Sequence, residues 1–307
     1  MKTANELANL IDTLTATTDS CIGIYAYHLP SGYCYQKNAH ERFFMASIFK
    51  IPIAIHCFKL IEQNKLHLTD PIEIRPTDIR PYGILDRHFH YPGVTLSLYN
   101  VMQLMLQLSD NTATDVILRL LGDAAAIMQS FSDPIFADLD ITHSCLQILL
   151  QQAGVVPLPV DERCTLEQIQ TLINAVPKAE QETAARNFSA NPPNTATPKV
   201  IAELLTQIRQ QTILTKESTH LLIHWMRGCK TGINRIRALL PANVQVADKT
   251  GTITGTIGDA AIIELPHNKG PLILVIFIKN STKPKELDEK LMAQIARAVF
   301  DHVSLIQ

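Results

Sequence analysis

The chain has 307 residues, of which 46% are hydrophobic and 18% charged, and its formal net charge at pH 7 is -2. This composition is typical of a globular protein with a sizeable core and excludes a disordered or fibrous chain. It gives no strongly basic surface for nucleic acid, and its longest apolar runs fall far short of the ~20 residues of a membrane helix, so we expect neither kind of partner.

The N-terminal part of the chain predicts one helix and two strands. Residues 4–16 carry apolar side chains at helical spacing, and residues 21–27 and 33–36 are predicted as strands around a proline-serine-glycine turn. No apolar signal-peptide core is visible, which leaves open both a cytoplasmic protein and a periplasmic or secreted protein that has lost its leader. Cys21 and Cys34 flank the predicted hairpin, where they can pair in an oxidising compartment or remain free thiols.

The middle of the chain is mainly helical, and the last third returns to strands. Helical spacing predicts helices at 47–64, in two runs within 97–121, at 165–175 and at 199–211. Strands rich in Val, Ile and Ala follow at 243–247, 256–264 and 272–280, and a helix at 286–304 closes the chain. The six cysteines form no zinc-like cluster, and His88 and His90 lack a third ligand nearby, so we expect no metal and no cofactor.

This order of elements predicts an α/β fold with two domains. An antiparallel sheet built from both chain ends and flanked by helices would form one domain from residues 1–46 and 212–307. The intervening residues 47–211 would form an inserted all-α lobe, with the active site in the cleft between the two domains.

Ser47 and Lys50 form the one S-x-x-K motif of the chain. At helical spacing i and i+3 the two side chains lie on the same face, one turn apart. A serine hydroxyl is a poor nucleophile until a base takes its proton, and a lysine becomes such a base when burial lowers its pKa. Because apolar residues surround this lysine on both sides, we expect it to be buried. The alternative is a solvated helix face.

Residues 109–111 spell Ser-Asp-Asn and interrupt a helical run. All three residue types favour a helix cap or turn, which is the simplest interpretation. The functional interpretation makes Ser109 a proton shuttle and Asn111 an amide that orients the substrate.

Lys249, Thr250 and Gly251 follow the strand-like residues 244–247. The ammonium and the hydroxyl suit a carboxylate, and the missing side chain of Gly251 would let a substrate lie along the strand edge. The same Lys-Thr-Gly triplet occurs at 230–232, in an expected turn between helices, and we interpret that copy as incidental.

In this order and spacing the three motifs resemble those of class A β-lactamases and penicillin-binding proteins. The resemblance covers most of the chain, is weakest at 122–190, and is carried beyond the motifs by residues 42–47, 109–114, 194–198, 225–228 and 235–252. It implies a monomeric serine hydrolase of β-lactamase/transpeptidase-like fold, which acts on a small β-lactam or peptide-like substrate.

By this resemblance Ser47 is the nucleophile, Lys50 is its base or proton relay, and Ser109 passes the proton to the leaving nitrogen. Asn111 would hold the side-chain amide of the substrate. The backbone N–H groups of Ser47 and Thr252 would form the oxyanion hole.

The substrate carboxylate would be bound by Lys249 and Thr250 according to the same resemblance. Some family members add an arginine directly after the Lys-Thr-Gly strand, but no arginine occurs between 250 and 280. Others place it on the preceding helix, and Arg235 matches that position. A surface ion pair is the alternative role of Arg235.

The chain departs from class A β-lactamases in the deacylating group, because it contains no E-x-x-L-N motif. By position the nearest carboxylates are Glu180 and Glu182, which also fit a solvated helix face. Three functions therefore stay open. These are β-lactam hydrolysis, a penicillin-binding, peptidase-like or esterase-like acyltransferase that deacylates slowly, and a catalytically silent binding protein.

Overall fold

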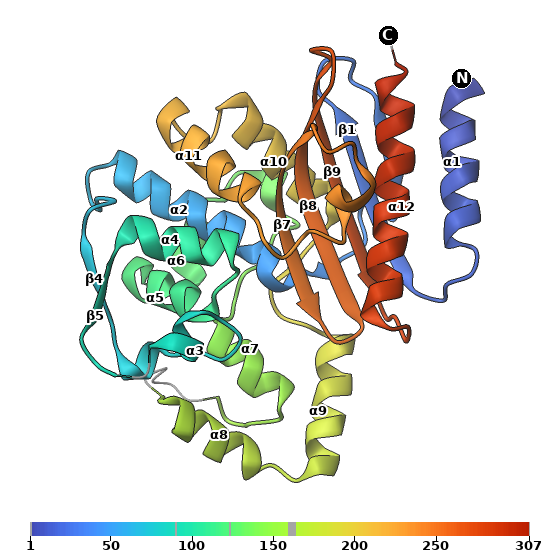
Figure 1. Ribbon diagram of the computed structural model, residues 1–307. Coiled ribbons are helices and arrows are strands. Elements are labelled where there is room, and N and C mark those ends of the chain that lie inside the picture. Colours follow the sequence, from blue (N-terminus) through green and yellow to red (C-terminus); the bar gives the residue numbers. More distant parts are fainter. Residues whose placement is uncertain (1, 90, 123, 159–163, 307) are drawn as a thin grey trace. The chain divides into compact units, whose positions relative to one another are not determined.

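The computed structural model describes residues 2–89, 91–122, 124–158 and 164–306, and the contacts within the chain divide it into two compact units (Figure 1). Unit 1 comprises Met1–Ile48, Asp133–Leu139 and Thr195–Gln307. Unit 2 comprises Phe49–Ser132 and Asp140–Asn194. Among the described residues, none of the helices has the length and apolar character to cross a membrane.

Unit 1 is built on a five-stranded antiparallel sheet of order β2-β1-β9-β8-β7 (Figure 1). Its strands are β1 (Cys21–His28), β2 (Cys34–Lys37), β7 (Gln245–Ile253), β8 (Thr256–Leu265) and β9 (Gly270–Lys279). Both ends of the chain supply strands to this sheet, as we predicted, because the N-terminal strand β1 pairs with the C-terminal strand β9.

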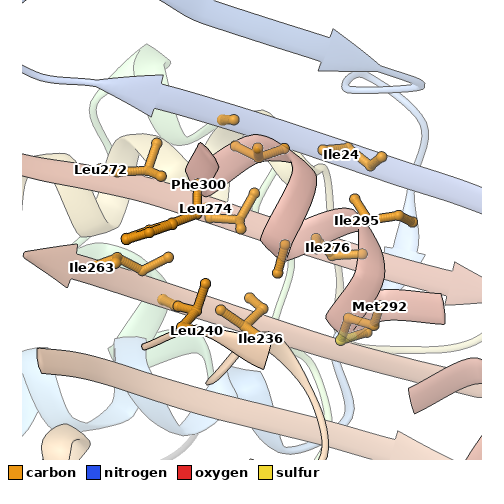
Figure 2. Close-up of a cluster of buried hydrophobic side chains, with 14 of the residues drawn as sticks. Ile24, Ile236, Leu240, Ile263, Leu272, Leu274, Ile276, Met292, Ile295 and Phe300 are labelled. Atoms are coloured by element: carbon orange, nitrogen blue, oxygen red, sulfur yellow. The ribbon is translucent and has the colours of Figure 1, made fainter. Parts of the chain in front are cut away.

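Helices cover both faces of the sheet. One face carries α1 (Lys2–Thr15) and α12 (Lys285–Ser304), and the other carries α10 (Pro198–Gln210) and α11 (Lys216–Arg227). Alternate residues of β9 point to the first face, where Leu274 and Ile276 pack against Ile295 and Phe300 of α12 (Figure 2). Burial of β9 on both faces explains why its sequence is a continuous apolar run.

The remaining elements of unit 1 are short. They are β3 (Phe43–Phe44), which pairs with β6 (Thr195–Ala196), and the 3-10 helices η3 (Pro134–Phe136) and η4 (Ile236–Leu239). A further 3-10 helix, η1 (Ala46–Phe49), carries the chain from unit 1 into unit 2, because the first segment of unit 1 ends at Ile48.

Unit 2 is mainly helical. Its helices are α2 (Lys50–Glu62), α3 (Leu85–His88), α4 (Leu98–Gln107), α5 (Asn111–Leu121), α6 (Ala124–Gln129), α7 (Cys145–Gln152), α8 (Leu166–Asn174) and α9 (Lys178–Ala190), with the 3-10 helix η2 (Pro76–Asp78). Most of α2 is buried, and it packs against α4, α5 and α6. Ser97 and Asp110 cap α4 and α5 with their side chains, which fixes where each helix begins.

The α/β fold class is therefore confirmed, with corrections to its details. Unit 2 is not all-α, because β4 (Pro71–Ile74) and β5 (Val94–Ser97) form a hairpin whose four-residue strands are too short to give a strong pattern. The unit boundary also differs from the predicted residue 212. Helix α10 stays with unit 1 because it packs on β1, β8 and β9.

One local prediction also needs correction, and the choice left open for Cys21 and Cys34 is decided in favour of free thiols. Strand β7 extends through the Lys-Thr-Gly motif and does not end before it, because β7 pairs with β8 along its whole length. Cys21 and Cys34 are free, and they lie at opposite ends of the hairpin, since Cys34 pairs with Tyr27. Six residues of strand separate Tyr27 from Cys21, about 20 Å, which no disulfide can span.

Candidate active site

The segment that ends at Ser47 lies against β7 within unit 1. A side chain at Gly251 would collide with the Met45 carbonyl oxygen and approach the Ala46 Cβ to 3.0 Å. The glycine therefore lets β7 pack directly on the backbone before Ser47. This differs from the predicted reason, which was to make room for a substrate. Ala46 has φ of 43°, a conformation that is uncommon for a residue with a side chain and that recurs at functional sites.

Lys249 and Thr250 are buried in β7, with relative exposures of 0% and 3%. The Lys249 ammonium donates to the Thr250 carbonyl oxygen at 2.9 Å. The Thr250 hydroxyl lies 2.5 Å from the hydroxyl of Thr231, in the other Lys-Thr-Gly triplet. That triplet lies in the turn after α11, as we expected, but its contact with Thr250 shows that its position is not incidental.

Arg235 is buried directly beside the end of this motif. Its Nη1 donates to the carbonyl oxygens of Gly251 and Gly258, both at 2.9 Å. Its Nη2 donates to the Thr252 hydroxyl at 2.6 Å, and its Nε donates to Glu289 of α12 at 3.1 Å. Only 3% of the Arg235 side chain is exposed, so the alternative of a surface ion pair is wrong.

Unit 2 brings three of the predicted residues together. Ser109 and Asn111 contact Lys50, which is the first residue of α2. The fully buried ammonium donates to the Ser109 carbonyl oxygen at 2.7 Å and to the Ser109 hydroxyl at 3.3 Å. It also donates to Asn111 Oδ1 at 2.9 Å. Burial lowers the pKa of Lys50, and the negative charges of Asp110 and Asp115 oppose that shift. The predicted burial of this lysine is confirmed.

The Ser-Asp-Asn motif forms the predicted helix cap, and its functional interpretation stays a prediction. Its aspartate is the cap, since one Asp110 oxygen accepts from the Ala113 N–H at 2.8 Å and the other from the Ile84 N–H at 2.6 Å. Ser109 has φ of 57°, which breaks the helical run between α4 and α5. With the aspartate holding the turn, the serine and the asparagine contact Lys50.

Glu180 and Glu182 do not join this group. Both are exposed on α9, and the hydrogen bonds found among the described residues do not connect them to Lys50, Ser109 or Asn111. Their placement is that of a solvated helix face.

A residue that the sequence did not single out lies beside Lys50 instead. Cys145, the first residue of α7, places its Sγ 3.5 Å from Asn111 Oδ1, the same oxygen that accepts from Lys50. Burial raises the pKa of the Cys145 thiol well above its usual range. The thiol is therefore protonated at neutral pH. The one local signal for α7 was the Ser144–Gln147 capping box, and it gives no indication of this contact.

The carboxylate nearest to this thiol is occupied structurally. Asp115 accepts from the backbone N–H groups of Cys145 at 2.8 Å and Leu146 at 3.0 Å. It also pairs with Arg80 Nε at 2.8 Å, and both side chains are almost fully buried. Asp115 thus anchors the start of α7 and is not available as a base.

The described residues contain no group of three or more His, Cys, Asp or Glu side chains that could hold a metal ion. His88 is among them, but His90 lies outside the described residues. The absence of a cofactor stays a prediction.

Residues 2–303 match the model of the β-lactamase enzyme family. The chain belongs to this family. It is 28% identical to β-lactamase SME-1 of Serratia marcescens, over 96% of this chain and 88% of that protein. It is 25% identical to β-lactamase VEB-1 of Pseudomonas aeruginosa, over 95% and 88% of the two chains. These relatives confirm the resemblance drawn from the three motifs and support a β-lactamase-like hydrolase.

The fold is shared with solved structures at lower identity. A β-lactamase from Chitinophaga pinensis superposes with a TM-score of 0.76 at 24% identity and covers 97% of this chain and 99% of its own. The TLA-3 extended-spectrum β-lactamase gives a TM-score of 0.78 at 20% identity, over 98% and 99% of the two chains. They confirm the predicted β-lactamase-like α/β architecture.

Proposed function

We propose that the protein is a serine hydrolase that opens the amide of a β-lactam by forming an acyl-enzyme on Ser47. The observation that carries this proposal is the hydrogen bonding of Lys50, a buried lysine whose ammonium contacts Ser109 and Asn111. A buried amine with a lowered pKa is suited to take a proton, and such a group has no structural reason to lie in an apolar helix.

In the proposed reaction, Lys50 takes the proton of the Ser47 hydroxyl, and the oxygen attacks the β-lactam carbonyl carbon. The negative charge on the carbonyl oxygen is stabilised by the N–H groups of Ser47 and Thr252. The C–N bond then breaks, and the nitrogen receives a proton through the Ser109 hydroxyl. Water later attacks the ester and returns the enzyme to its free form.

Binding of the substrate carboxylate is assigned to the β7 motif. Lys249 supplies a buried positive charge, Thr250 a hydroxyl, and Arg235 a second buried cation held at the Gly251 carbonyl. In this proposal an ammonium, a hydroxyl and a guanidinium lie at the edge strand β7, and such groups suit an anion.

A second candidate is favoured by the thiol beside Lys50. Hydrolysis of the acyl-enzyme needs a base for water, and a protonated thiol cannot take a proton. The protein would then be acylated by β-lactams as penicillin-binding enzymes are, and it would deacylate slowly.

The intact mass of the protein, followed after addition of benzylpenicillin, separates these functions. We expect a covalent adduct on the wild type that forms and then clears, and no adduct on Ser47→Ala. An adduct that persists would favour the second candidate. Absence of an adduct on the wild type would overturn both and point to a catalytically silent relative.

A further inference from the structure

The two Lys-Thr-Gly triplets of unit 1 lie against each other. Thr231 Oγ1 is 2.5 Å from Thr250 Oγ1, although 19 residues separate them in the chain. A side chain at Gly232 would collide with the Asp248 carboxylate and reach the Thr250 methyl group at 3.3 Å. The glycine therefore allows the turn after α11 to pack directly on β7, and this brings the exposed Thr231 to the buried Thr250.

The role of this contact depends on which of the two hydroxyl groups donates its hydrogen. A threonine hydroxyl has one hydrogen to donate and two lone pairs that accept. When Thr250 donates to Thr231, its hydrogen is used and it offers only lone pairs to a bound carboxylate. When Thr231 donates to Thr250, the hydrogen of Thr250 remains for the carboxylate.

Cys229 is compatible with the second arrangement. Its buried Sγ lies 3.3 Å from Thr231 Oγ1, where a thiol hydrogen can be donated to that oxygen. The hydrogens then run in one direction, from Cys229 to Thr231 to Thr250. Hydrogen bonds in such a chain polarise one another, so each link strengthens the next.

We propose that Thr231 is a positioning residue, which orients the Thr250 hydroxyl as a donor to the carboxylate of the substrate. The inference rests on the proposed function and narrows its substrate class to β-lactams that carry a free carboxylate. Thr231 acts through Thr250, so its effect belongs to binding and not to the chemical step at Ser47.

The test compares Thr231→Val, which removes the hydroxyl and keeps the shape, with Thr231→Ser, which keeps the hydroxyl. Acylation by benzylpenicillin and by its methyl ester is followed by intact mass over a range of concentrations. We expect Thr231→Val to raise the half-saturating concentration of benzylpenicillin about fivefold, the size of one neutral hydrogen bond, with the limiting rate unchanged. Thr231→Ser should restore the wild-type value, and the methyl ester should show no difference.

A double variant makes the inference sharper. Because Thr231 acts only through Thr250, adding Thr231→Val to Thr250→Val should change nothing further. Additive effects would overturn the inference, as would a lowered limiting rate or an equal loss with the methyl ester. Thr212→Val is the matched control, since it removes another exposed threonine hydroxyl of unit 1. An adduct that forms equally well on Thr231→Val and the wild type contradicts this inference alone, whereas no adduct on the wild type contradicts the proposed function.

Discussion

The two units differ in the groups that they gather around the predicted residues. Along β7, unit 1 places two buried cations, Lys249 and Arg235, together with the Thr250 hydroxyl. In unit 2, the described hydrogen bonds of Lys50 all go to neutral oxygens, and the Cys145 thiol contacts one of these oxygens, Asn111 Oδ1. The described part of unit 1 therefore contains groups suited to anion binding, and the described part of unit 2 contains groups suited to acylation. Among the described residues of unit 2, no carboxylate that could activate water contacts Lys50.

This difference matters because the two half-reactions need different groups. Acylation needs a nucleophile, a proton relay and a donor for the leaving nitrogen, whereas deacylation needs a base for water. In the proposed function, the residues matched by the resemblance serve the first half-reaction. Changes to each unit therefore have distinct expected effects.

The largest effect is expected at Lys50. Lys50→Met keeps an unbranched side chain in α2 but removes the amine, so acylation by benzylpenicillin should slow about 10³-fold, as for the loss of a general base. The rate of adduct formation measures it. Lys59→Met is the matched control, because Lys59 lies on the same helix and donates instead to the Ser130 carbonyl oxygen. Equal acylation by Lys50→Met and the wild type would remove Lys50 from the mechanism.

The next effect concerns the carboxylate that is not found in contact with Lys50 among the described residues of unit 2. Cys145→Glu would introduce a base next to Asn111 and Lys50, and we expect the acyl-enzyme to clear about 10²-fold faster than in the wild type. Cys145→Gln has the same size without the base and should show no acceleration. The lifetime of the benzylpenicillin adduct is the measurement. If the two variants clear the adduct at the same rate, the identity of residue 145 does not limit deacylation.

The sequence was sufficient where the chemistry is local. Ser47 and Lys50 are three residues apart in an apolar stretch, and this predicted the burial of Lys50 that is observed. The apolar strands and amphipathic helices likewise predicted the sheet and its flanking helices, because their periodicity follows from which face is buried.

The remainder of the candidate site depends on contacts between distant parts of the chain. Cys145 contacts Asn111, which is 34 residues away in the chain, and Thr231 contacts Thr250, which is 19 residues away. Neither pair leaves a periodic pattern, since each results from how a turn or a helix start packs. The extent of β7 was hidden for a related reason, because its buried lysine and threonine look like a polar loop in the sequence.

The stability of unit 1 should depend strongly on Arg235. Arg235→Ala removes the nearer and buried partner of Glu289, which keeps only the exposed Lys285 ammonium at 3.6 Å, and breaking such a buried pair costs about 3–5 kcal/mol. Urea denaturation measures the change. Arg297→Ala removes an ion pair of the same unit whose side chains are about half exposed, and we expect a much smaller shift in the midpoint. Equal shifts of the urea midpoint in the two variants would mean that the free protein does not form the Arg235 contacts.

The smallest effect concerns the pH dependence contributed by Asp259, which faces the same arginine. Burial raises the pKa of Asp259 to about 6, against a usual value of 3.8. The folded protein therefore holds this proton between pH 4 and 6 more tightly than the unfolded chain. Stability from this group should fall as pH rises through that window, by up to about 3 kcal/mol.

Asp259→Asn tests the sign of this effect. The amide resembles the protonated acid, so the thermal midpoints of wild type and variant should converge near pH 4. Near pH 7, where the wild-type carboxylate is ionised without full solvation, the variant should melt at the higher temperature. In the opposite trend, the thermal midpoint of the wild type would rise relative to that of the variant as the pH increases. This would mean that the charge of Arg235 has a larger effect on the pKa of Asp259 than burial has. Unit 1 would then hold a further preformed ion pair next to β7, besides those of Arg235 with Glu289 and Arg237 with Asp248.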